Sequence, residues 1–262
     1  MVKADIKTSI VIAVLDSHKA VERQLKFFNS MDLPDDIEII LVDDGSDPPL
    51  KNFLYSEYRP QNLRVLRHDL DAEWTQPAAR NFGVRQSRGE YLILTDIDHI
   101  LTKELILYVH SGQYDYMQFD REVAILNEDG NFVQDEESAF EYGYQKKRYR
   151  DGGFKIAKHV NSFGVKKDVY WKAGGVSEHL CGTGEYPNRE EKHFRYRCSK
   201  WGEKGTIRVC PEDERPIIYM FPCGKYAGDV DHNPYGLFHT LSRKTPQNRQ
   251  WKWQQAGRFD DK

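Results

Sequence analysis

An apolar strand that runs directly into two closely spaced aspartates constrains this chain most, at residues 91–98. Residues 91–94 are apolar without the alternation of a half-exposed strand, as in strands covered by helices on both faces. Asp96 and Asp98 follow, and strand alternation would turn Ile97 to the other face and both carboxylates to one side. Because ligands of open parallel sheets bind beyond the carboxyl ends of the strands, this feature predicts an α/β fold with an acidic site at that edge.

Strand and helix signals alternate upstream of these aspartates. Strands are expected at residues 8–15 and 37–43, and the apolar spacing between them predicts a helix capped by Ser17. Strand, helix and strand at this spacing form a parallel unit. The second strand ends in Asp43 and Asp44, so two acid pairs are expected at one edge of the sheet.

The remaining elements are shorter. A third strand is expected at residues 63–67, and a helix from Thr75 onward, with Pro77 tolerated in its first turn. After residue 114 the pattern changes to short strands with a β-hairpin around residues 127–131. The fold class expected is therefore α/β, with a mostly parallel central sheet flanked by helices, a small β-hairpin region and an irregular C-terminal extension.

Charge and hydropathy argue against nucleic acid and membranes as partners. The chain has 38 basic and 41 acidic residues, a net charge of -3, which does not favour electrostatic capture of nucleic acid or of an anionic membrane. The N-terminus lacks an apolar signal core, and no window approaches the roughly 18 apolar residues of a membrane span. We expect a cytoplasmic protein with no transmembrane segment and no nucleic-acid partner.

Five short motifs occur in a fixed order along the chain. They are VDDGS at residues 42–46, ARNFG at 79–83, GEY at 89–91 followed by the acids of DID, GGVSE at 174–178 and EEKHFRYR at 190–197. In this order they resemble the inverting family-two glycosyltransferases of the GT-A (nucleotide-diphospho-sugar transferase) fold, whose usual pattern ends in GGFDE and EDxDLxxR. The resemblance spans roughly residues 8–202, and the order is more specific than any single motif.

The resemblance implies a nucleotide-sugar donor, with UDP as the nucleotide. Asp44 would accept a hydrogen bond from the uracil ring or ribose, Asp43 would serve the nucleotide or the turn, and Asp96 would contact ribose or metal-bound water. Arg80 and Asn81 would lie on a helix beneath the donor. The alternatives are a turn aspartate bonded to its own backbone for Asp44, and a surface charge and a helix-bound polar residue for Arg80 and Asn81.

The resemblance also implies a divalent cation. Asp98 would bind it directly with help from Asp96, and carboxylate oxygens suit Mn²⁺ or Mg²⁺. A late histidine completes the metal shell in some relatives, and His232, in Asp-His-Asn-Pro, is favoured over His239 for that position. A turn or packing histidine is the alternative for each.

The chain departs from the family pattern at the expected general base. Glu191 stands where the family has an aspartate, and it would deprotonate the acceptor hydroxyl with a side chain one methylene longer. Glu185 and Glu190 are the other candidates. Alternatively, residues 188–191 form a capping box in which Glu191 is the acid at N3.

The leading hypothesis is a metal-dependent, inverting glycosyltransferase that moves a sugar from a UDP-sugar to a hydroxyl of a carbohydrate or glycoconjugate acceptor. Residues 1–262 would form one domain, with a nucleotide-sugar-binding half at 1–112 and an acceptor-binding half plus C-terminal extension at 113–262. Three alternatives stay open: a retaining glycosyltransferase of the same fold, a sugar-phosphate nucleotidyltransferase and a non-catalytic carbohydrate-binding protein. The nucleotidyltransferase usually needs a glycine-rich basic loop near the N-terminus, which residues 13–18 do not supply.

Overall fold

A six-stranded sheet forms the centre of the molecule. The computed structural model describes residues 5–53, 58–70, 72, 75–134, 155–156, 161–181 and 191–220. The sheet order is β3-β2-β1-β4-β11-β6, and the strands are β1 (Thr8–Val14), β2 (Ile37–Asp43), β3 (Leu63–Arg67), β4 (Tyr91–Asp96), β6 (Tyr116–Gln118) and β11 (Phe163–Lys166). The first four are parallel, whereas β11 runs antiparallel to β4 and β6. The predicted mostly parallel α/β sheet is confirmed.

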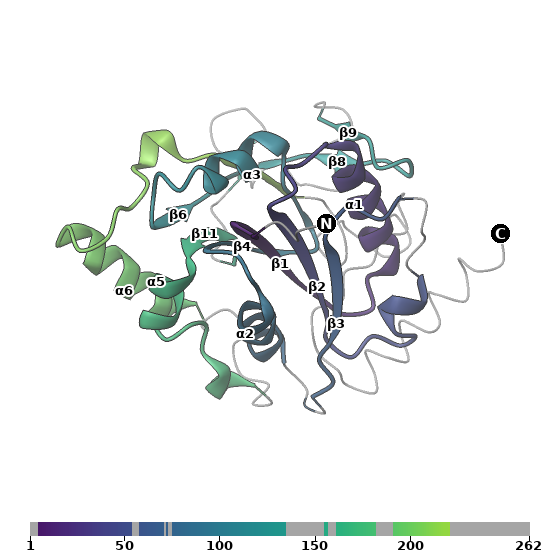
Figure 1. The fold of residues 1–262 in the computed structure, drawn as a ribbon, viewed down its shortest axis with the longest axis horizontal. Coiled ribbons are helices and arrows are strands. Elements are labelled where there is room, and N and C mark those ends of the chain that lie inside the picture. Colours follow the sequence, from purple (N-terminus) through teal and green to yellow (C-terminus); the bar gives the residue numbers. More distant parts are fainter. Residues whose placement is uncertain are drawn as a thin grey trace.

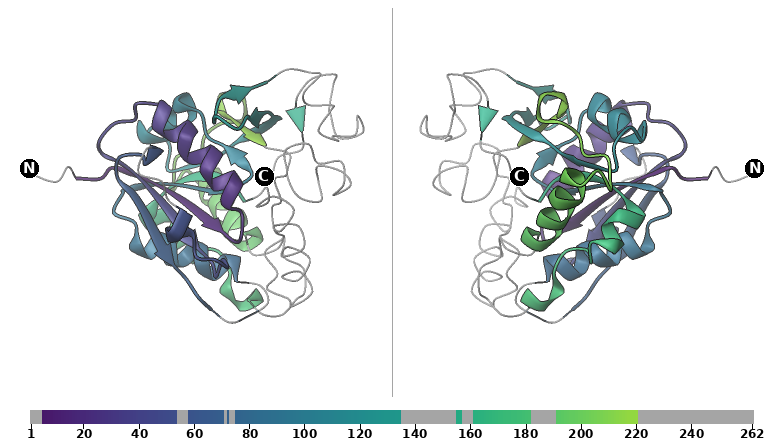
Figure 2. Two further views of the ribbon diagram at one scale, coloured as in Figure 1. Left: turned by 90° about the vertical axis from the view of Figure 1, so that its right-hand side faces the viewer. Right: turned by 90° about the vertical axis from the view of Figure 1, so that its left-hand side faces the viewer.

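Helices cover both faces of this sheet (Figures 1 and 2). Ile10 and Ile12 of β1 pack into one apolar cluster with α1 and α3, and Val11 and Ala13 pack into a second cluster with α2, α5 and α6. The helices are α1 (His18–Ser30), α2 (Gln76–Gln86), α3 (Lys103–His110), α5 (Lys167–Lys172) and α6 (Lys192–Glu203). Because side chains of a strand alternate between faces, burial on both sides explains why residues 10–14 of β1 are an uninterrupted apolar run.

A smaller sheet lies beside the central one. Its order is β10-β7-β12-β5, with β5 (His99–Ile100), β7 (Asp120–Val123), β10 (Lys155–Ile156) and β12 (Ile217–Met220). The antiparallel pair β8 (Ile125–Leu126) and β9 (Phe132–Val133) is the predicted hairpin. Its turn is held by the Asn127 side-chain oxygen, which accepts from the amides of Asp129 and Asn131 at 3.0 and 2.9 Å. The expected C-terminal extension lies outside the described residues beyond Met220, and the single-domain organisation stays a prediction.

Helices α1 and α2 start where the sequence predicts, but the cap hydrogen bond expected for α1 is not formed. Helix α2 follows Thr75 and carries a proline in its first turn, as expected. Helix α1 has Ser17 at its N-cap position, as predicted, but the Ser17 side chain makes no cap hydrogen bond. The Ser17 hydroxyl donates instead to the carbonyl of Leu15 at 2.9 Å, because serine side chains readily bond to nearby backbone.

Gly83 lets α2 lie close to β1 and β2. A Cβ atom at this position would meet Val11 Cγ1 at 2.5 Å and Val42 Cγ2 at 2.7 Å. Ordinary van der Waals contact begins at 3.4 Å, so any other residue would push the helix away from the sheet or displace both valines.

A buried carboxylate ties together the amino-terminal ends of the strands. Glu38, on β2, is fully buried and accepts from the Ser9 hydroxyl at 2.7 Å and from the Arg88 amide at 2.6 Å. It also pairs with the guanidinium groups of Arg64 and Arg88 at 3.1 and 2.8 Å. Burial alone raises the pKa of Glu38, but the hydrogen bonds from Arg88, Ser9 and Arg64 outweigh it and leave that pKa below its usual 4.5.

Glu38→Gln should lower the free energy of unfolding by about 2 kcal/mol at neutral pH, since a hydrogen bond to a charged group contributes roughly 1.5–3 kcal/mol. Because the folded pKa is lowered, this stabilisation is complete above the usual value of 4.5 and is lost as pH falls through the folded pKa. Urea unfolding between about pH 7 and pH 3 measures it. The exposed Glu90→Gln is the control and should stay within about 0.5 kcal/mol of wild type. If the difference in unfolding free energy between wild type and Glu38→Gln is as large in acid as at neutral pH, this account is contradicted.

Candidate active site

The predicted acid pairs lie at the same edge of the sheet. Val14 of β1 pairs with Asp43 on one side, and Ala13 pairs with Asp96 on the other. The carboxyl ends of β2 and β4 therefore flank β1. This is the edge at which open parallel sheets bind ligands.

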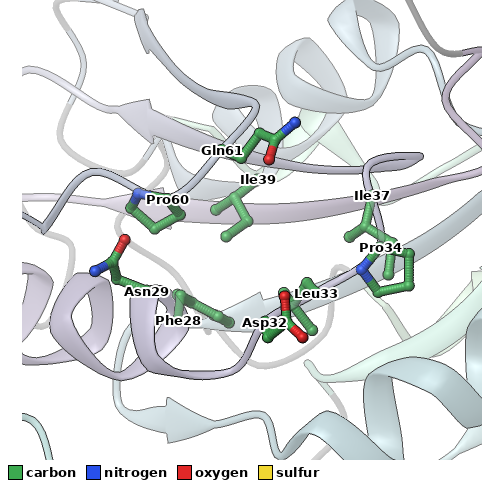
Figure 3. Close-up of a pocket in the computed structure, with 9 residues that line it drawn as sticks. All are labelled: Phe28, Asn29, Asp32, Leu33, Pro34, Ile37, Ile39, Pro60 and Gln61. Carbon is green, nitrogen blue, oxygen red and sulfur yellow. The ribbon is translucent and has the colours of Figure 1, made fainter.

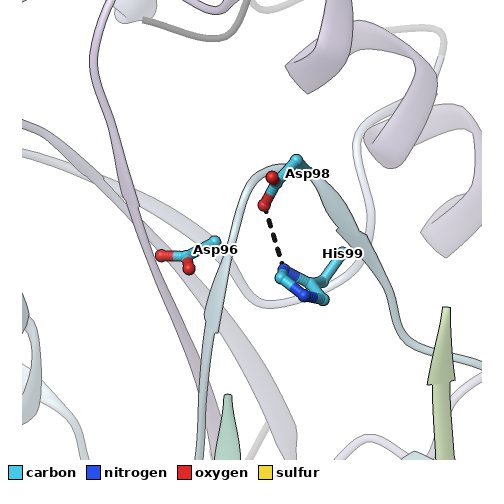
Figure 4. A group of neighbouring side chains, drawn as sticks. All are labelled: Asp96, Asp98 and His99. Carbon is cyan, nitrogen blue, oxygen red and sulfur yellow. Dashed lines mark ion pairs between the residues drawn. The ribbon is translucent and has the colours of Figure 1, made fainter. Parts of the chain in front are cut away.

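Asp96, Asp98 and His99 form a compact group at the end of β4 (Figure 4). One ligand atom of each lies within 4.8 Å of the others, and all three side chains are buried. The Nδ1 atom of His99 is 3.0 Å from Asp98 Oδ1. Strand alternation does not bring the carboxylates together, because β4 ends at Asp96 and Asp98 lies in the turn that follows.

The donor set of this group fits a divalent cation. Two carboxylates and an imidazole are ligands that Mn²⁺ accepts, and the carboxylates alone suit Mg²⁺. The turn that presents them is fixed from α1, since the Gln24 amide donates to the carbonyls of Ile97 and His99 at 3.3 and 2.9 Å. His99 was not predicted as a site residue, although it directly follows Asp98. His232, the predicted histidine ligand, lies outside the described residues.

Asp43 holds the turn after β2. Its Oδ1 accepts from the Ser46 amide at 2.9 Å, and its Oδ2 accepts from the Leu50 amide at 3.0 Å and from Arg67 at 2.8 Å. Burial alone lowers the pKa of Arg67, but Asp43 and Asp69 outweigh it and raise that pKa. Asp43 thus has a defined structural role, and its contact with a nucleotide stays a prediction.

Asp44 is joined to two other elements. Its Oδ1 lies 3.0 Å from His68 Nδ1, and its Oδ2 accepts from the Thr75 hydroxyl at 2.7 Å. These bonds reach the end of β3 and the start of α2 rather than its own turn. A carboxylate accepts about four hydrogen bonds, so both are compatible with a nucleoside contact. Neither partner was predicted, although His68 directly follows the parallel strand β3, whose carboxyl end lies at the same edge of the sheet.

Arg80 of α2 joins two buried carboxylates. Its Nη2 donates to Asp96 Oδ1, and its Nη1 donates to Glu191 Oε1 at 3.0 Å. The three side chains are 1%, 7% and 1% exposed. Gln76, in the first turn of the same helix, also donates to Asp96 Oδ1, at 2.8 Å. The alternative of a surface charge is therefore wrong for Arg80, and its contact with a donor stays a prediction.

Glu191 directly precedes α6 and is fully buried. With its amide nitrogen turned toward the carboxylate, Asn161 donates to both Glu191 oxygens at 3.2 Å. The capping interpretation is wrong for Glu191, because the helix begins at Lys192 and the Glu191 side chain makes no cap hydrogen bond. The other candidate bases, Glu185 and Glu190, lie outside the described residues.

Asn81 ties α2 to the GGVSE segment. Its Nδ2 donates to the Val176 carbonyl at 2.9 Å and to Glu178 at 2.7 Å, and its Oδ1 accepts from the Tyr170 hydroxyl at 2.5 Å. Burial raises the pKa of Tyr170, which keeps the hydroxyl a donor. A Cβ at Gly175 would meet Asn81 Oδ1 at 2.8 Å, and the positive φ there also favours glycine. A donor-binding role for Asn81 stays a prediction.

A pocket of about 180 Å³ lies at the opposite end of β2 from these acids (Figure 3). It opens between the end of α1 and the start of β2 and is lined by Phe28, Asn29, Asp32, Leu33, Pro34, Ile37, Ile39, Pro60 and Gln61. Ile37 begins β2 and Asp43 ends it, so this pocket is not part of the acidic site.

Comparison with known sequences decides the family. The sequence profile of glycosyl transferase family 2 matches residues 9–173, well over half of the chain. The chain belongs to glycosyl transferase family 2. The cellulose synthase catalytic subunit [UDP-forming] of Komagataeibacter sucrofermentans is 26% identical over 99 residues, which are 38% of this chain and 12% of that protein.

Solved structures agree with the family 2 assignment at the level of the fold. The crystal structure of Staphylococcus aureus TarS 1–349 has a TM-score of 0.53 and 16% identity over 82% of this chain and 60% of TarS 1–349. Its complex with UDP-GlcNAc has a TM-score of 0.54 and 16% identity over 82% of this chain and 58% of the other. The predicted GT-A fold is confirmed. Among the described residues, no helix is long and apolar enough to cross a bilayer.

Proposed function

We propose that this family 2 chain transfers a sugar from a nucleotide-diphosphate donor to an acceptor hydroxyl with inversion. The observation that carries the proposal is the arrangement of Asp44, Asp96, Asp98 and Glu191 around the carboxyl edge of a family 2 sheet. UDP as the nucleotide is supported by the UDP-GlcNAc complex of TarS 1–349 and by the UDP-forming activity in the name of the cellulose synthase subunit.

The chemistry is a single displacement. The acceptor oxygen attacks the anomeric carbon, the bond from that carbon to the diphosphate oxygen breaks, and the hydroxyl proton passes to the Glu191 carboxylate. Attack opposite the leaving group inverts the anomeric configuration. Because Glu191 is fully buried, a hydroxyl reaches it only when neighbouring side chains move aside.

A metal ion would complete the donor site. Asp96 and Asp98 would hold Mn²⁺ or Mg²⁺, with His99 beside them. When bound, the ion neutralises charge on the departing nucleotide diphosphate. Asp44, held by His68 and Thr75, would meet the nucleoside at the neighbouring strand end.

Titration calorimetry and a donor panel test the proposal. UDP should bind, and bind more tightly with Mn²⁺, and one UDP-sugar of the panel should be hydrolysed slowly without an acceptor. With an acceptor, NMR of the product should show the inverted anomer. Binding of UTP with pyrophosphate release from a sugar 1-phosphate would indicate a nucleotidyltransferase, and sugar binding without UDP binding would indicate a carbohydrate-binding protein.

Asp44→Ala should weaken UDP binding by about 1 to 3 kcal/mol, or roughly 5- to 150-fold, because a buried partner on the nucleoside is left unpaired. The rate of the bound complex should change little, since this contact is made equally in the ground and transition states. Thr75→Val is the matched control, because it removes one hydrogen bond to Asp44 and keeps the carboxylate. Unchanged UDP affinity in Asp44→Ala would restrict the residue to a structural role.

A further inference from the structure

We propose that Arg80 is a positioning residue that fixes the candidate base Glu191 relative to the donor-side carboxylate of Asp96, and that it makes no contact with the donor itself. The inference rests on the proposed function, because it takes Glu191 as the base.

Both terminal nitrogens of Arg80 are aimed at carboxylates. Nη2 donates to Asp96 and Nη1 donates to Glu191 at 3.0 Å. The side chain is only 1% exposed, so the guanidinium faces protein groups rather than an open donor site. A guanidinium can donate in two directions from one rigid plane, which lets a single side chain set the separation of two acids.

The charge balance also requires this residue. Two carboxylates that are 7% and 1% exposed are held beside one guanidinium, which stays protonated in proteins. Buried carboxylates without a cation repel each other and lose their solvation. A lysine would supply the charge from one point but could not span both acids.

The guanidinium joins three separate elements. Arg80 lies on α2, Asp96 ends β4 and Glu191 precedes α6, at separations of 16 and 111 residues along the chain. Asn161, shortly before β11, holds the same Glu191 carboxylate, and β11 pairs with β4. Contacts from both sides thus hold Glu191 against the edge that carries Asp96, so the predicted base and the predicted metal ligand occupy a fixed relative position.

Arg80→Lys tests the inference, with Arg85→Lys as the matched control. Arg85 lies on the same helix, is 50% exposed and pairs with Glu178 at 3.3 Å. Two quantities are measured for each variant: the affinity for UDP with Mn²⁺ by calorimetry, and kcat for transfer at saturating donor. Thermal unfolding shows that each variant is folded.

Arg80→Lys should lower kcat at least about 30-fold and change UDP affinity by no more than about threefold, because a positioning residue acts on the chemical step. Combined with Glu191→Gln, it should slow transfer by no more than a further threefold or so, since residues that act as a unit are not additive. If Arg80→Lys does not fold, the charge-balanced pair Arg80→Gln and Glu191→Gln replaces it. That pair should match Glu191→Gln alone in both quantities.

The outcomes separate this inference from the function on which it rests. A loss of UDP affinity above about tenfold in Arg80→Lys, or in the charge-balanced pair, would show that Arg80 acts on donor binding, by direct contact or through Asp96, rather than on the position of the base. Multiplicative losses of kcat would show that it acts independently of Glu191. Either result overturns the positioning role while the glycosyltransferase stands. Full transfer in Glu191→Gln would refute the base assignment and, with it, the positioning role of Arg80. A wild-type protein that neither binds UDP nor transfers sugar would refute both the proposed function and this inference.

Discussion

Glu191→Gln should slow sugar transfer by roughly 10²- to 10⁴-fold, the usual contribution of general-base catalysis, while UDP affinity stays near wild type. Glutamine has the same shape and can still accept the hydrogen bond from Arg80, but it takes up no proton at neutral pH. The proton transfer is removed, and the contact with Arg80 is kept with a neutral acceptor.

The structure changes the stability expected of this variant. Glu191 pairs with a buried guanidinium rather than capping α6, so Glu191→Gln should lower the free energy of unfolding by about 1 to 3 kcal/mol. Glu203→Gln, at the exposed end of the same helix, is the control for both transfer and unfolding. Transfer and urea unfolding are measured on the same samples. Full transfer in Glu191→Gln would move the base assignment to Glu185 or Glu190.

Asp98→Ala should abolish metal-dependent turnover, with a loss of at least about 10³-fold at limiting Mn²⁺, because a bound ion contributes several kcal/mol of charge stabilisation. The fold should be retained, since Asp98 lies in the turn after β4 rather than inside the packed sheet. Electron paramagnetic resonance of free Mn²⁺ gives the metal affinity directly, and it should fall in parallel with turnover.

Asp129→Ala is the matched control for that experiment. Asp129 is an exposed aspartate in the turn of the β8–β9 hairpin, so its loss removes one negative charge that is not part of the Asp96–Asp98–His99 group. It should leave Mn²⁺ affinity and turnover unchanged. Wild-type rates in Asp98→Ala at limiting Mn²⁺ would refute the metal assignment.

The features predicted correctly from the sequence are those set by local patterns. Largely apolar runs predicted β1, β2 and β4, because strands that are buried on both faces carry few polar side chains, of which Glu38 in β2 is one. Parallel pairing then places Asp43 and Asp96 at one edge without further information. His68 and His99 could have been predicted by the same reasoning, since His68 directly follows β3 and His99 lies three residues after the end of β4.

The features that were missed depend on contacts between distant residues. The antiparallel insertion of β11 beside β4 has no signal in its four residues, and it alone places Asn161 near Glu191. Residues 188–191 have the local pattern of a capping box, but the Glu191 side chain is held by Arg80, 111 residues away. A buried guanidinium offers a carboxylate a stronger partner than a helix terminus does, so tertiary structure overrides the local preference.

The absence of a side chain at Gly83 also bears on Arg80, which lies one helical turn away in α2. Arg80 stands three residues earlier in α2, so the distance of that helix from the strands sets how far its guanidinium extends beneath the carboxyl edge. Where the helix rather than the two valines gives way, Gly83→Ala would lift α2 off Val11 and Val42, and Arg80 would move with it. One methyl group on the sheet-facing side of α2 would therefore disturb the guanidinium that Asp96 and Glu191 share, without changing either acid.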